Sequence, residues 1–180
     1  VDTGALDPAA AARLIRADGA LLLHLLEAAS LVRERRSGRT VTYSRKDFIP
    51  LTHLCRDQCA YCTFVRRPSD PLAHTMTPEE VLAVAEAGSA AGCKEALFSL
   101  GDKPELRYAT YRRWLAERGY ARTIEYLRDM CALVLERTGL LPHANPGVMS
   151  EDDIALLRPV TASMGLMLES TSERLLERGG

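Results

Sequence analysis

The pattern of hydrophobic and polar positions predicts two N-terminal helices followed by alternating strands and helices. An Asp-Pro pair at residues 7–8 is typical of a helix start, because aspartate caps free backbone N–H groups and proline is tolerated in the first turn. We expect this helix over Ala9–Ala17 and a second one over Ala20–Arg36. After them, the β-branched stretch Thr40–Ser44 predicts a short edge strand.

From residue 48 onward, short apolar runs of strand length alternate with helical segments. The predicted strands are Phe48–Leu54, Lys94–Leu100, Leu140–Ala144 and Ala162–Leu168. The predicted helices are Thr77–Ala91, Tyr108–Arg118, Arg122–Arg137, a helix capped by Ser150, and a last helix that begins at Ser170 or Ser172. Strands separated by helices indicate βαβ units and a parallel sheet, and both a doubly wound sheet and a β/α barrel fit this order.

The composition is that of a globular protein and excludes several other classes. With 47% hydrophobic and 26% charged residues, the 180-residue chain is not a disordered tail, a collagen-like rod or a disulfide-dense miniprotein. The net charge of −1 gives no strong attraction to nucleic acid or to an anionic membrane. No apolar run approaches the roughly 18–20 residues that span a bilayer, and the start lacks the order of a signal peptide. We therefore expect a cytoplasmic protein without nucleic-acid or membrane partners.

The cysteines are the most informative residues of the chain. Cys55, Cys59 and Cys62 form a C-x3-C-x2-C motif directly after the first predicted strand of the alternating region, whereas Cys93 and Cys131 lie alone in apolar surroundings. An odd number of cysteines without a secretory signal argues against a disulfide framework. The cluster therefore indicates metal ligands or catalytic thiols.

Several kinds of site are compatible with three clustered thiols. Soft thiolates favour zinc, copper(I) or iron–sulfur clusters. Zinc would need a fourth ligand, for which His53 and His74 are nearby candidates, but structural zinc sites usually combine two C-x2–4-C pairs. A 4Fe–4S cluster held by three cysteines instead leaves one iron open to a substrate or cofactor. Three unrelated buried cysteines are the remaining alternative.

The cysteine motif, with Tyr61 immediately before its last cysteine, resembles the signature of radical S-adenosylmethionine (SAM) enzymes. The surrounding sequence TYSRKDFIPLTHLCRDQCAYCTF resembles the deazaflavin-forming FO synthases, as do the later stretches CKEALFSLGDKPE, HANPG and MGLMLES. The resemblance runs from about Val41 to the last residue. It implies an α/β fold, the radical SAM partial (β/α)6 TIM-like barrel, of which about four βα units are present here. We expect a helical extension at residues 1–39 and the N-terminal portion of the radical SAM core at residues 40–180.

The same resemblance implies a reaction and its partners. FO synthases use two radical SAM halves: one joins tyrosine to a ribityl-diaminouracil, and the other cyclises the adduct to the deazaflavin FO, with release of ammonia, for coenzyme F-420 biosynthesis. The stretches LCRDQCAYCTF and LGDKPE resemble the cyclising half, which is N-terminal in fused proteins. The implied partners are the tyrosine–ribityluracil adduct, an electron donor such as flavodoxin or ferredoxin, and the tyrosine-joining half. The alternatives are the tyrosine-joining half itself, another radical SAM enzyme, and a non-catalytic iron–sulfur or zinc-binding domain.

For the cofactors, the resemblance implies that Cys55, Cys59 and Cys62 hold a 4Fe–4S cluster whose open iron binds the amino and carboxylate groups of SAM. One electron from the cluster would cleave SAM, and the 5′-deoxyadenosyl radical would remove a hydrogen from the substrate. The chain must orient these groups and exclude water, because the difficult chemistry belongs to the cofactors.

Seven further residues are expected to bind the cofactor or the substrate. They are Tyr61, Gly101, Asp102, Glu105, Asn145, Glu169 and Ser170. Most follow predicted strand ends, where ligands bind in parallel α/β folds. Gly101-Asp102 stands where the family has a Gly-Gly-Glu turn, so its carboxylate would accept from the SAM ammonium, and Glu105 could share or take that role. The alternatives are a simple turn at Asp102, a turn or cap at Asn145, a helix cap at Ser170 and core packing of Tyr61.

Overall fold

The computed structural model describes residues 6–168 and 170–177, which belong to two compact units, residues 1–43 and 44–180. The first unit contains helices α1 (Pro8–Leu14) and α2 (Gly19–Ser37), close to their predicted ranges. The Asp7 carboxylate caps α1 by accepting from the backbone N–H of Ala10 at 3.1 Å. No residue of α1 or α2 is buried.

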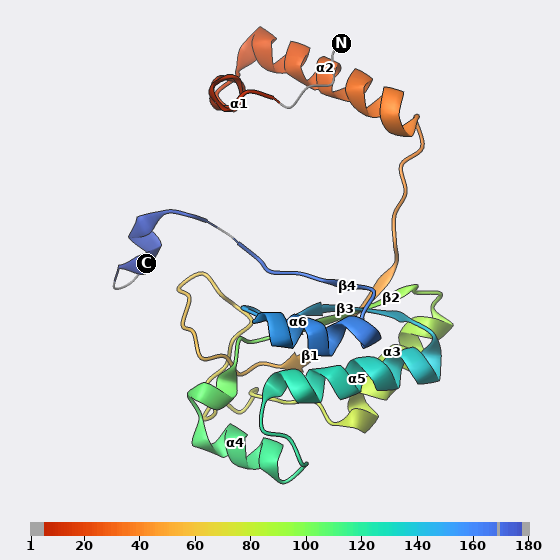
Figure 1. Cartoon of the computed structure of the whole chain (residues 1–180), viewed down its shortest axis with the longest axis vertical. Helices are drawn as coiled ribbons and strands as arrows, with labels where there is room; N and C mark the ends of the chain where they lie inside the picture. The colour runs from red at the N-terminus through yellow and green to blue at the C-terminus, as the bar shows by residue number, and fades with distance from the viewer. Residues whose placement is uncertain (1–5, 169, 178–180) are drawn as a thin grey trace. The chain divides into compact units, whose positions relative to one another are not determined.

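The second unit is built on a four-stranded parallel sheet in the order β1-β2-β3-β4. Its strands are β1 (Lys46–Thr52), β2 (Glu95–Leu100), β3 (Leu141–Asn145) and β4 (Ser163–Met164). One register row crosses the whole sheet, through Ile49, Phe98, Ala144 and Met164. A doubly wound sheet reverses its strand order part-way, whereas here each new strand adds beside the previous one. This sequential order is that of a β/α barrel wall, and Figure 1 shows the strands side by side.

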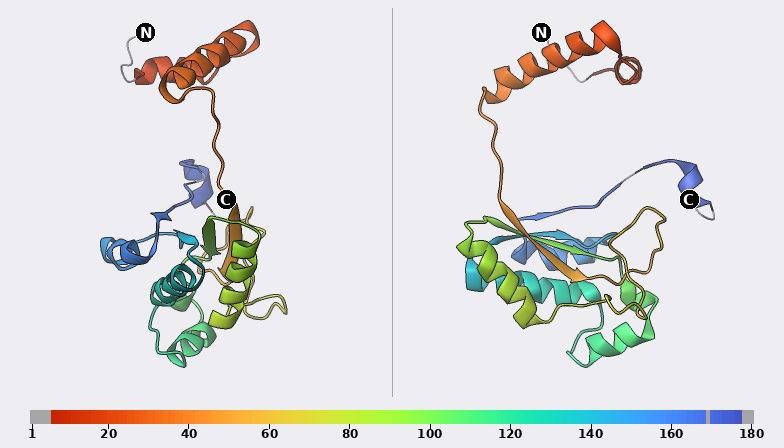
Figure 2. Two further views of the ribbon diagram at one scale, coloured as in Figure 1. Left: turned by 90° about the vertical axis from the view of Figure 1, so that its right-hand side faces the viewer. Right: turned by 180° about the vertical axis from the view of Figure 1, so that it is seen from behind.

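The helices of this unit are α3 (Pro78–Ala90), α4 (Ala109–Ala116), α5 (Thr123–Thr138) and α6 (Glu151–Leu157), with 3-10 turns η1 (Pro104–Leu106), η2 (Arg158–Val160) and η3 (Glu173–Leu176). Helices α3 and α5 pack against each other and against one face of the sheet, as the two views of Figure 2 show. The core between these layers is fully buried and includes Ile49, Leu51, Val81, Phe98, Leu127 and Val134. No helix in the described part of the chain is long and apolar enough to cross a membrane.

The predicted helix starts at Thr77 and Ser150 are confirmed. The Thr77 hydroxyl accepts from the Glu80 N–H, and the Glu80 carboxylate accepts from the Thr77 N–H at 2.7 Å. Ser150 and Asp153 make the same reciprocal pair at the start of α6. These capping boxes satisfy backbone N–H groups that have no partner inside their helices.

Three expectations about local structure are wrong. Residues 40–44 form no strand, since in the described part of the chain none of them pairs with a strand of the four-stranded sheet. The strand predicted over Ala162–Leu168 is reduced to Ser163–Met164, since β4 is the sheet edge and pairs only with β3. The last predicted helix is the single 3-10 turn η3, and residues 178–180 lie outside the described residues. A segment this short forms a helix only when tertiary packing supports it, and the described side chains of residues 170–174 are exposed.

Candidate functional site

Polar groups gather at the C-terminal ends of β1, β2 and β3, which share one edge of the parallel sheet. Cys55 follows β1 and Asp102 follows β2, and each is only 7% exposed. The Cys55 sulfur accepts from the backbone N–H of Asp102 at 3.2 Å and of Asp57 at 3.3 Å. Burial raises the pKa of the Cys55 thiol, while these two N–H groups favour the thiolate and act against that rise. The structure therefore brings two of the predicted site residues into direct contact.

Gly101 permits this contact. A β-carbon at position 101 would lie 2.0 Å from the Leu54 carbonyl oxygen and 2.5 Å from the β-carbon of Cys55. Such distances are far inside van der Waals contact, so only glycine fits. Glycine at this position thus lets the end of β2 approach the chain's own cysteine loop.

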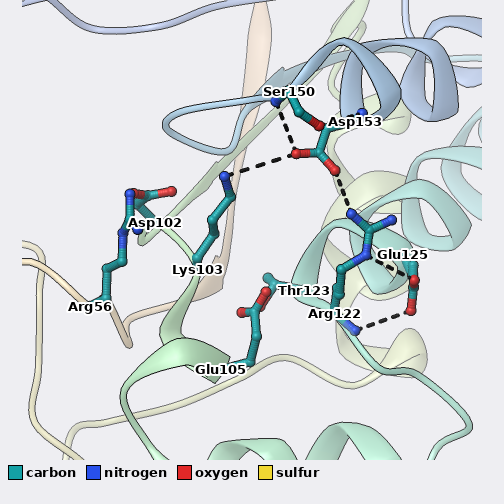
Figure 3. Close-up of polar contacts among 9 residues, drawn as sticks. All are labelled: Arg56, Asp102, Lys103, Glu105, Arg122, Thr123, Glu125, Ser150 and Asp153. Atoms are coloured by element: carbon teal, nitrogen blue, oxygen red, sulfur yellow. Dashed lines mark hydrogen bonds and ion pairs between the residues drawn. The ribbon is translucent and has the colours of Figure 1, made fainter.

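The Asp102 carboxylate is held on one side and unpartnered on the other. Its Oδ2 accepts from both Nε and Nη2 of Arg56, each at 2.7 Å. Its Oδ1 is buried and has no hydrogen-bond partner among the described residues. Gly147, at φ +82°, packs so closely that an added β-carbon would lie 2.8 Å from the Asp102 β-carbon. Figure 3 shows Arg56 beside Asp102 at the end of the β2 strand.

Asn145, the last residue of β3, presents a second buried oxygen. Its Oδ1 has no hydrogen-bond partner in the part of the chain that the structure describes. Gly165, just after β4, leaves room for it, because a β-carbon there would lie 2.3 Å from that oxygen. Buried polar atoms are rarely left without partners in folded proteins. Two such acceptors on neighbouring strand ends are therefore suited to hydrogen-bond donors of a bound ligand.

The other two cysteines lie further along the same loop. Cys59 is exposed and Cys62 is half-buried, and both line a hollow of about 330 Å³ together with Arg67 and Tyr108. Within residues 6–168 and 170–177, no three His, Cys, Asp or Glu side chains are close enough to hold a metal ion. Neither His53 nor His74, the two candidate zinc ligands, forms such a group with the cysteines. The thiols thus share one loop of eight residues without forming a closed metal site.

The remaining predicted residues lie elsewhere. The buried Glu105 carboxylate accepts from the Thr123 hydroxyl at 2.5 Å, and Figure 3 shows it turned toward α5 and away from Asp102. Tyr61 is 63% exposed. Ser170 is exposed, and its hydroxyl accepts from the Ser172 N–H at 3.1 Å. Residue 169, the predicted Glu169, lies outside the described residues.

A second polar network stands beside this edge and ties three segments together (Figure 3). The Asp153 carboxylate accepts from Arg122 Nη1 at 2.7 Å and from the Ser150 N–H at 3.1 Å, with Lys103 Nζ at 3.9 Å. Burial acts to raise the pKa of Asp153, but these hydrogen bonds outweigh it and hold the pKa below its usual value. The network joins the loop after β2 to the starts of α5 and α6. It borders a cavity of about 250 Å³ lined by residues that include Leu100, Glu105, Leu106, Ile124 and Val148.

Comparison with known proteins identifies the family. Residues 49–180 match the profile described as the radical SAM superfamily. The chain belongs to the radical SAM superfamily. Membership implies a 4Fe–4S cluster and SAM as cofactors, as the resemblance to radical SAM enzymes implied. The residues present fit these cofactors, since the loop supplies three soft thiol donors and the neighbouring strand ends supply two unpartnered oxygens.

Curated relatives of this radical SAM chain include FO synthases. The FO synthase of Mycobacterium leprae is 58% identical over 144 residues, and the match covers 78% of this chain and 17% of that protein. The FO synthase of Nocardia farcinica is 53% identical over 176 residues, and the match covers 93% of this chain and 20% of that protein. The 7,8-didemethyl-8-hydroxy-5-deazariboflavin synthase of Methanopyrus kandleri is 50% identical over 140 residues, with 78% and 42% covered. The chain thus spans about a fifth of the two FO synthases, and the predicted resemblance to this group is confirmed.

Two solved structures share the fold. Methylornithine synthase (PylB) aligns with a TM-score of 0.69 and 22% identity, covering 96% of this chain and 47% of that one. HydG, a maturase of the FeFe-hydrogenase, aligns with a TM-score of 0.73 and 18% identity, and the alignment covers 94% of this chain and 35% of HydG. These likenesses confirm the predicted α/β partial barrel.

Sequence reasoning missed three residues of the site: Arg56, Gly147 and Gly165. An arginine inside a cysteine motif, with an acidic residue at the end of the next strand, is a signal that could have pointed to the Arg56–Asp102 pair. Gly147 lies in the stretch HANPG and Gly165 in the stretch MGLMLES, both of which resemble FO synthases. Their roles depend on which side chain lies opposite, which only the folded arrangement shows.

Proposed function

We propose that this chain contains the N-terminal portion of the radical SAM core of the FO synthase half that cyclises the tyrosine–ribityluracil adduct to FO with release of ammonia. The observation that carries the proposal is the match to the Methanopyrus kandleri protein, whose name gives the deazaflavin product. The match takes up 42% of that protein but only 17% of the Mycobacterium leprae FO synthase. The Methanopyrus protein is therefore less than half as long, and it still contains the counterpart of this chain.

In this proposal, the strand-end residues bind and orient the cofactors. Cys55, Cys59 and Cys62 hold the cluster, and the two buried oxygens accept from SAM. The Oδ1 of Asp102 accepts from the SAM ammonium, and the Oδ1 of Asn145 accepts from another donor of the same molecule. Hydrogen bonds to a charged group contribute about 1.5–3 kcal/mol each. When bound, the cluster and SAM supply the radical that removes a hydrogen from the substrate.

The proposal extends to partners and to domain organisation. Residues 1–39 form a helical extension, and residues 40–180 form the portion of the core described above. An electron donor of the flavodoxin or ferredoxin type reduces the cluster, and the tyrosine-joining half supplies the adduct. The longer FO synthases among the relatives support a protein that also contains the second half.

Turnover of the full chain under argon, with reconstituted cluster, SAM and a reductant, tests the proposal. Given the tyrosine–ribityluracil adduct, the enzyme should release ammonia and form FO, which is detected by its fluorescence. Given tyrosine and the ribityl-diaminouracil instead, a single cyclising half should form no adduct. Adduct formation without FO would assign the chain to the tyrosine-joining half. Failure to form 5′-deoxyadenosine with any substrate would contradict a radical SAM activity.

A further inference from the structure

We propose that Arg56 is a positioning residue for SAM, because it fixes the Asp102 carboxylate with Oδ1 turned toward the SAM ammonium. This inference rests on the proposed role of Asp102 as the acceptor for that ammonium. It assigns a function to a residue that lies inside the cysteine motif and is not itself a cluster ligand.

The geometry of the Arg56–Asp102 pair indicates that Arg56 orients the Asp102 carboxylate in addition to neutralising its charge. Both Arg56 donors, Nε and Nη2, reach the same oxygen, Oδ2 of Asp102, at 2.7 Å. The other oxygen, Oδ1, is buried without a partner among the described residues. A carboxylate fixed through one oxygen cannot rotate freely, so its second oxygen keeps one direction. The backbone of Gly147 packs against the same side chain and limits its movement further.

Backbone hydrogen bonds connect this pair to the cluster loop. The Arg56 N–H donates to the Asp102 carbonyl at 2.9 Å, and the Asp102 N–H donates to the Cys55 sulfur at 3.2 Å. The Arg56 carbonyl in turn accepts from Arg107 Nη1 at 2.5 Å. Arg56 therefore links a cluster ligand and the SAM acceptor through both its backbone and its side chain. The distance between the open iron and the ammonium site would depend on this link.

The length of the acidic side chain makes such a link necessary. Aspartate stands here where the family pattern has glutamate, so the carboxylate has one methylene less to reach a ligand and fewer rotamers to adjust. A shorter side chain binds the ammonium well only when its direction is already set. The hydrogen bonds to Asp102 also raise the pKa of the Arg56 guanidinium, which keeps its positive charge throughout.

If Arg56 only stabilised the fold, its loss would affect folding and not SAM affinity specifically. The Arg56 side chain is 35% exposed, and partly exposed ion pairs contribute little to folding. Loss of the arginine should therefore leave folding and cluster content nearly unchanged, whereas SAM affinity should fall. The two roles separate experimentally because they affect different measurements.

The test is a double-mutant cycle on the full chain with reconstituted cluster under argon. Binding of SAM is measured by calorimetry and by the change that SAM causes in the electron paramagnetic resonance spectrum of the reduced cluster. We expect Arg56→Ala to weaken SAM binding about tenfold with iron content unchanged, and Asp102→Ala to weaken it by about tenfold to a hundredfold. The double variant should bind no more weakly than Asp102→Ala, because Arg56 acts only through that carboxylate.

Two further variants make the result specific. Arg113→Ala removes one positive charge from the exposed face of α4 and should bind SAM like the wild type. Arg56→Lys keeps the charge but replaces the planar pair of donors, Nε and Nη2, by one flexible ammonium group, so it should retain only part of the affinity. Full restoration by lysine would show that charge alone is needed, and it would overturn positioning.

The other outcomes distinguish the inference from the proposal beneath it. If Arg56→Ala binds SAM normally or more tightly while Asp102→Ala binds weakly, positioning by Arg56 is wrong and the role of Asp102 stands. If Asp102→Ala binds SAM normally, the acceptor role fails and the inference fails with it. Loss of iron in both Arg56→Ala and Arg56→Lys would overturn positioning and make Arg56 a structural part of the cysteine loop.

Discussion

Replacement of Gly101 by alanine tests the contact between β2 and the cysteine loop. The added methyl group would lie 2.0 Å from the Leu54 carbonyl oxygen and 2.5 Å from the Cys55 β-carbon, whereas nonbonded carbon atoms rest about 3.5–4.0 Å apart. The neighbours are backbone and β-carbon atoms, which cannot rotate away as the end of a long side chain would. The loop must therefore move by more than about 1 Å.

The structure sets the expected magnitude. Overpacking usually costs about 1–3 kcal/mol, and we expect the upper end here because no flexible group gives way. For a domain of this size, about 3 kcal/mol lowers the midpoint of thermal unfolding by about 6–12 °C. Displacement of the loop should also expose the Cys55 thiol, which is 7% exposed in the wild type.

Thermal unfolding and thiol labelling of the apoprotein measure both effects. Gly101→Ala should unfold at the lower temperature and should react at Cys55 nearly as fast as at the exposed Cys59. The control is Gly119→Ala, where φ is +83° and no atom lies within 4 Å of an added β-carbon, so only backbone strain of about 1–2 kcal/mol is introduced. The reasoning is refuted if both alanine variants unfold at the same temperature and Cys55 stays protected.

Three further predictions concern other parts of the site. Gly165→Ala should weaken SAM binding about tenfold in calorimetry without loss of iron, because its methyl would lie 2.3 Å from Asn145 Oδ1; normal binding would contradict this. Thr123→Val should lower the free energy of unfolding by about 1–3 kcal/mol in urea and leave SAM affinity unchanged, because it removes the hydroxyl donor of the buried Glu105 carboxylate. Burial acts to raise the pKa of Asp153, but hydrogen bonds hold it below 3.8. The contribution of this carboxylate to the free energy of unfolding should therefore be complete above that pH and lost as the pH falls further. Urea unfolding at about pH 5 and about pH 3 should show this loss in the wild type and not in Asp153→Asn.

Local signals in the sequence were sufficient for most of the helices and inner strands. Thr77 and Ser150 each precede an acidic residue by three positions, and the capping boxes they form depend only on neighbours in the chain. The strands β2 and β3 come from short stretches rich in apolar residues between helices, which is enough to predict them. The predictions over residues 40–44 and at the last helix failed because local propensity is not sufficient by itself: among the described residues, 40–44 join no sheet and the side chains of 170–174 are exposed.

The candidate site was predictable only in its outline. The parallel order places residues that follow strands at one edge, and this accounts for the contact between Cys55 and Asp102. The partners within the site depend on positions far apart in the chain. Arg56 and Asp102 are separated by 46 residues, and the Glu105 carboxylate contacts Thr123 at the start of α5 and not the strand-end residues around Asp102. The position of Arg56 in the motif and of Asp102 after the next strand points to their pairing, but hydrophobic periodicity does not report the contact between Glu105 and Thr123, which follows from how the loops pack.

The iron content of cysteine variants tests the central claim most directly. After anaerobic reconstitution of the full chain, the wild type should contain about four irons and four sulfides for this motif, and Cys55→Ala, Cys59→Ala and Cys62→Ala should each lose the cluster absorbance. Cys93→Ala is the matched control, since this cysteine lies outside the motif, two residues before β2, and it should keep the full cluster. With SAM and a reductant, the wild type and Cys93→Ala should form 5′-deoxyadenosine and the three motif variants should not. A motif variant that keeps its four irons and still cleaves SAM would contradict the account.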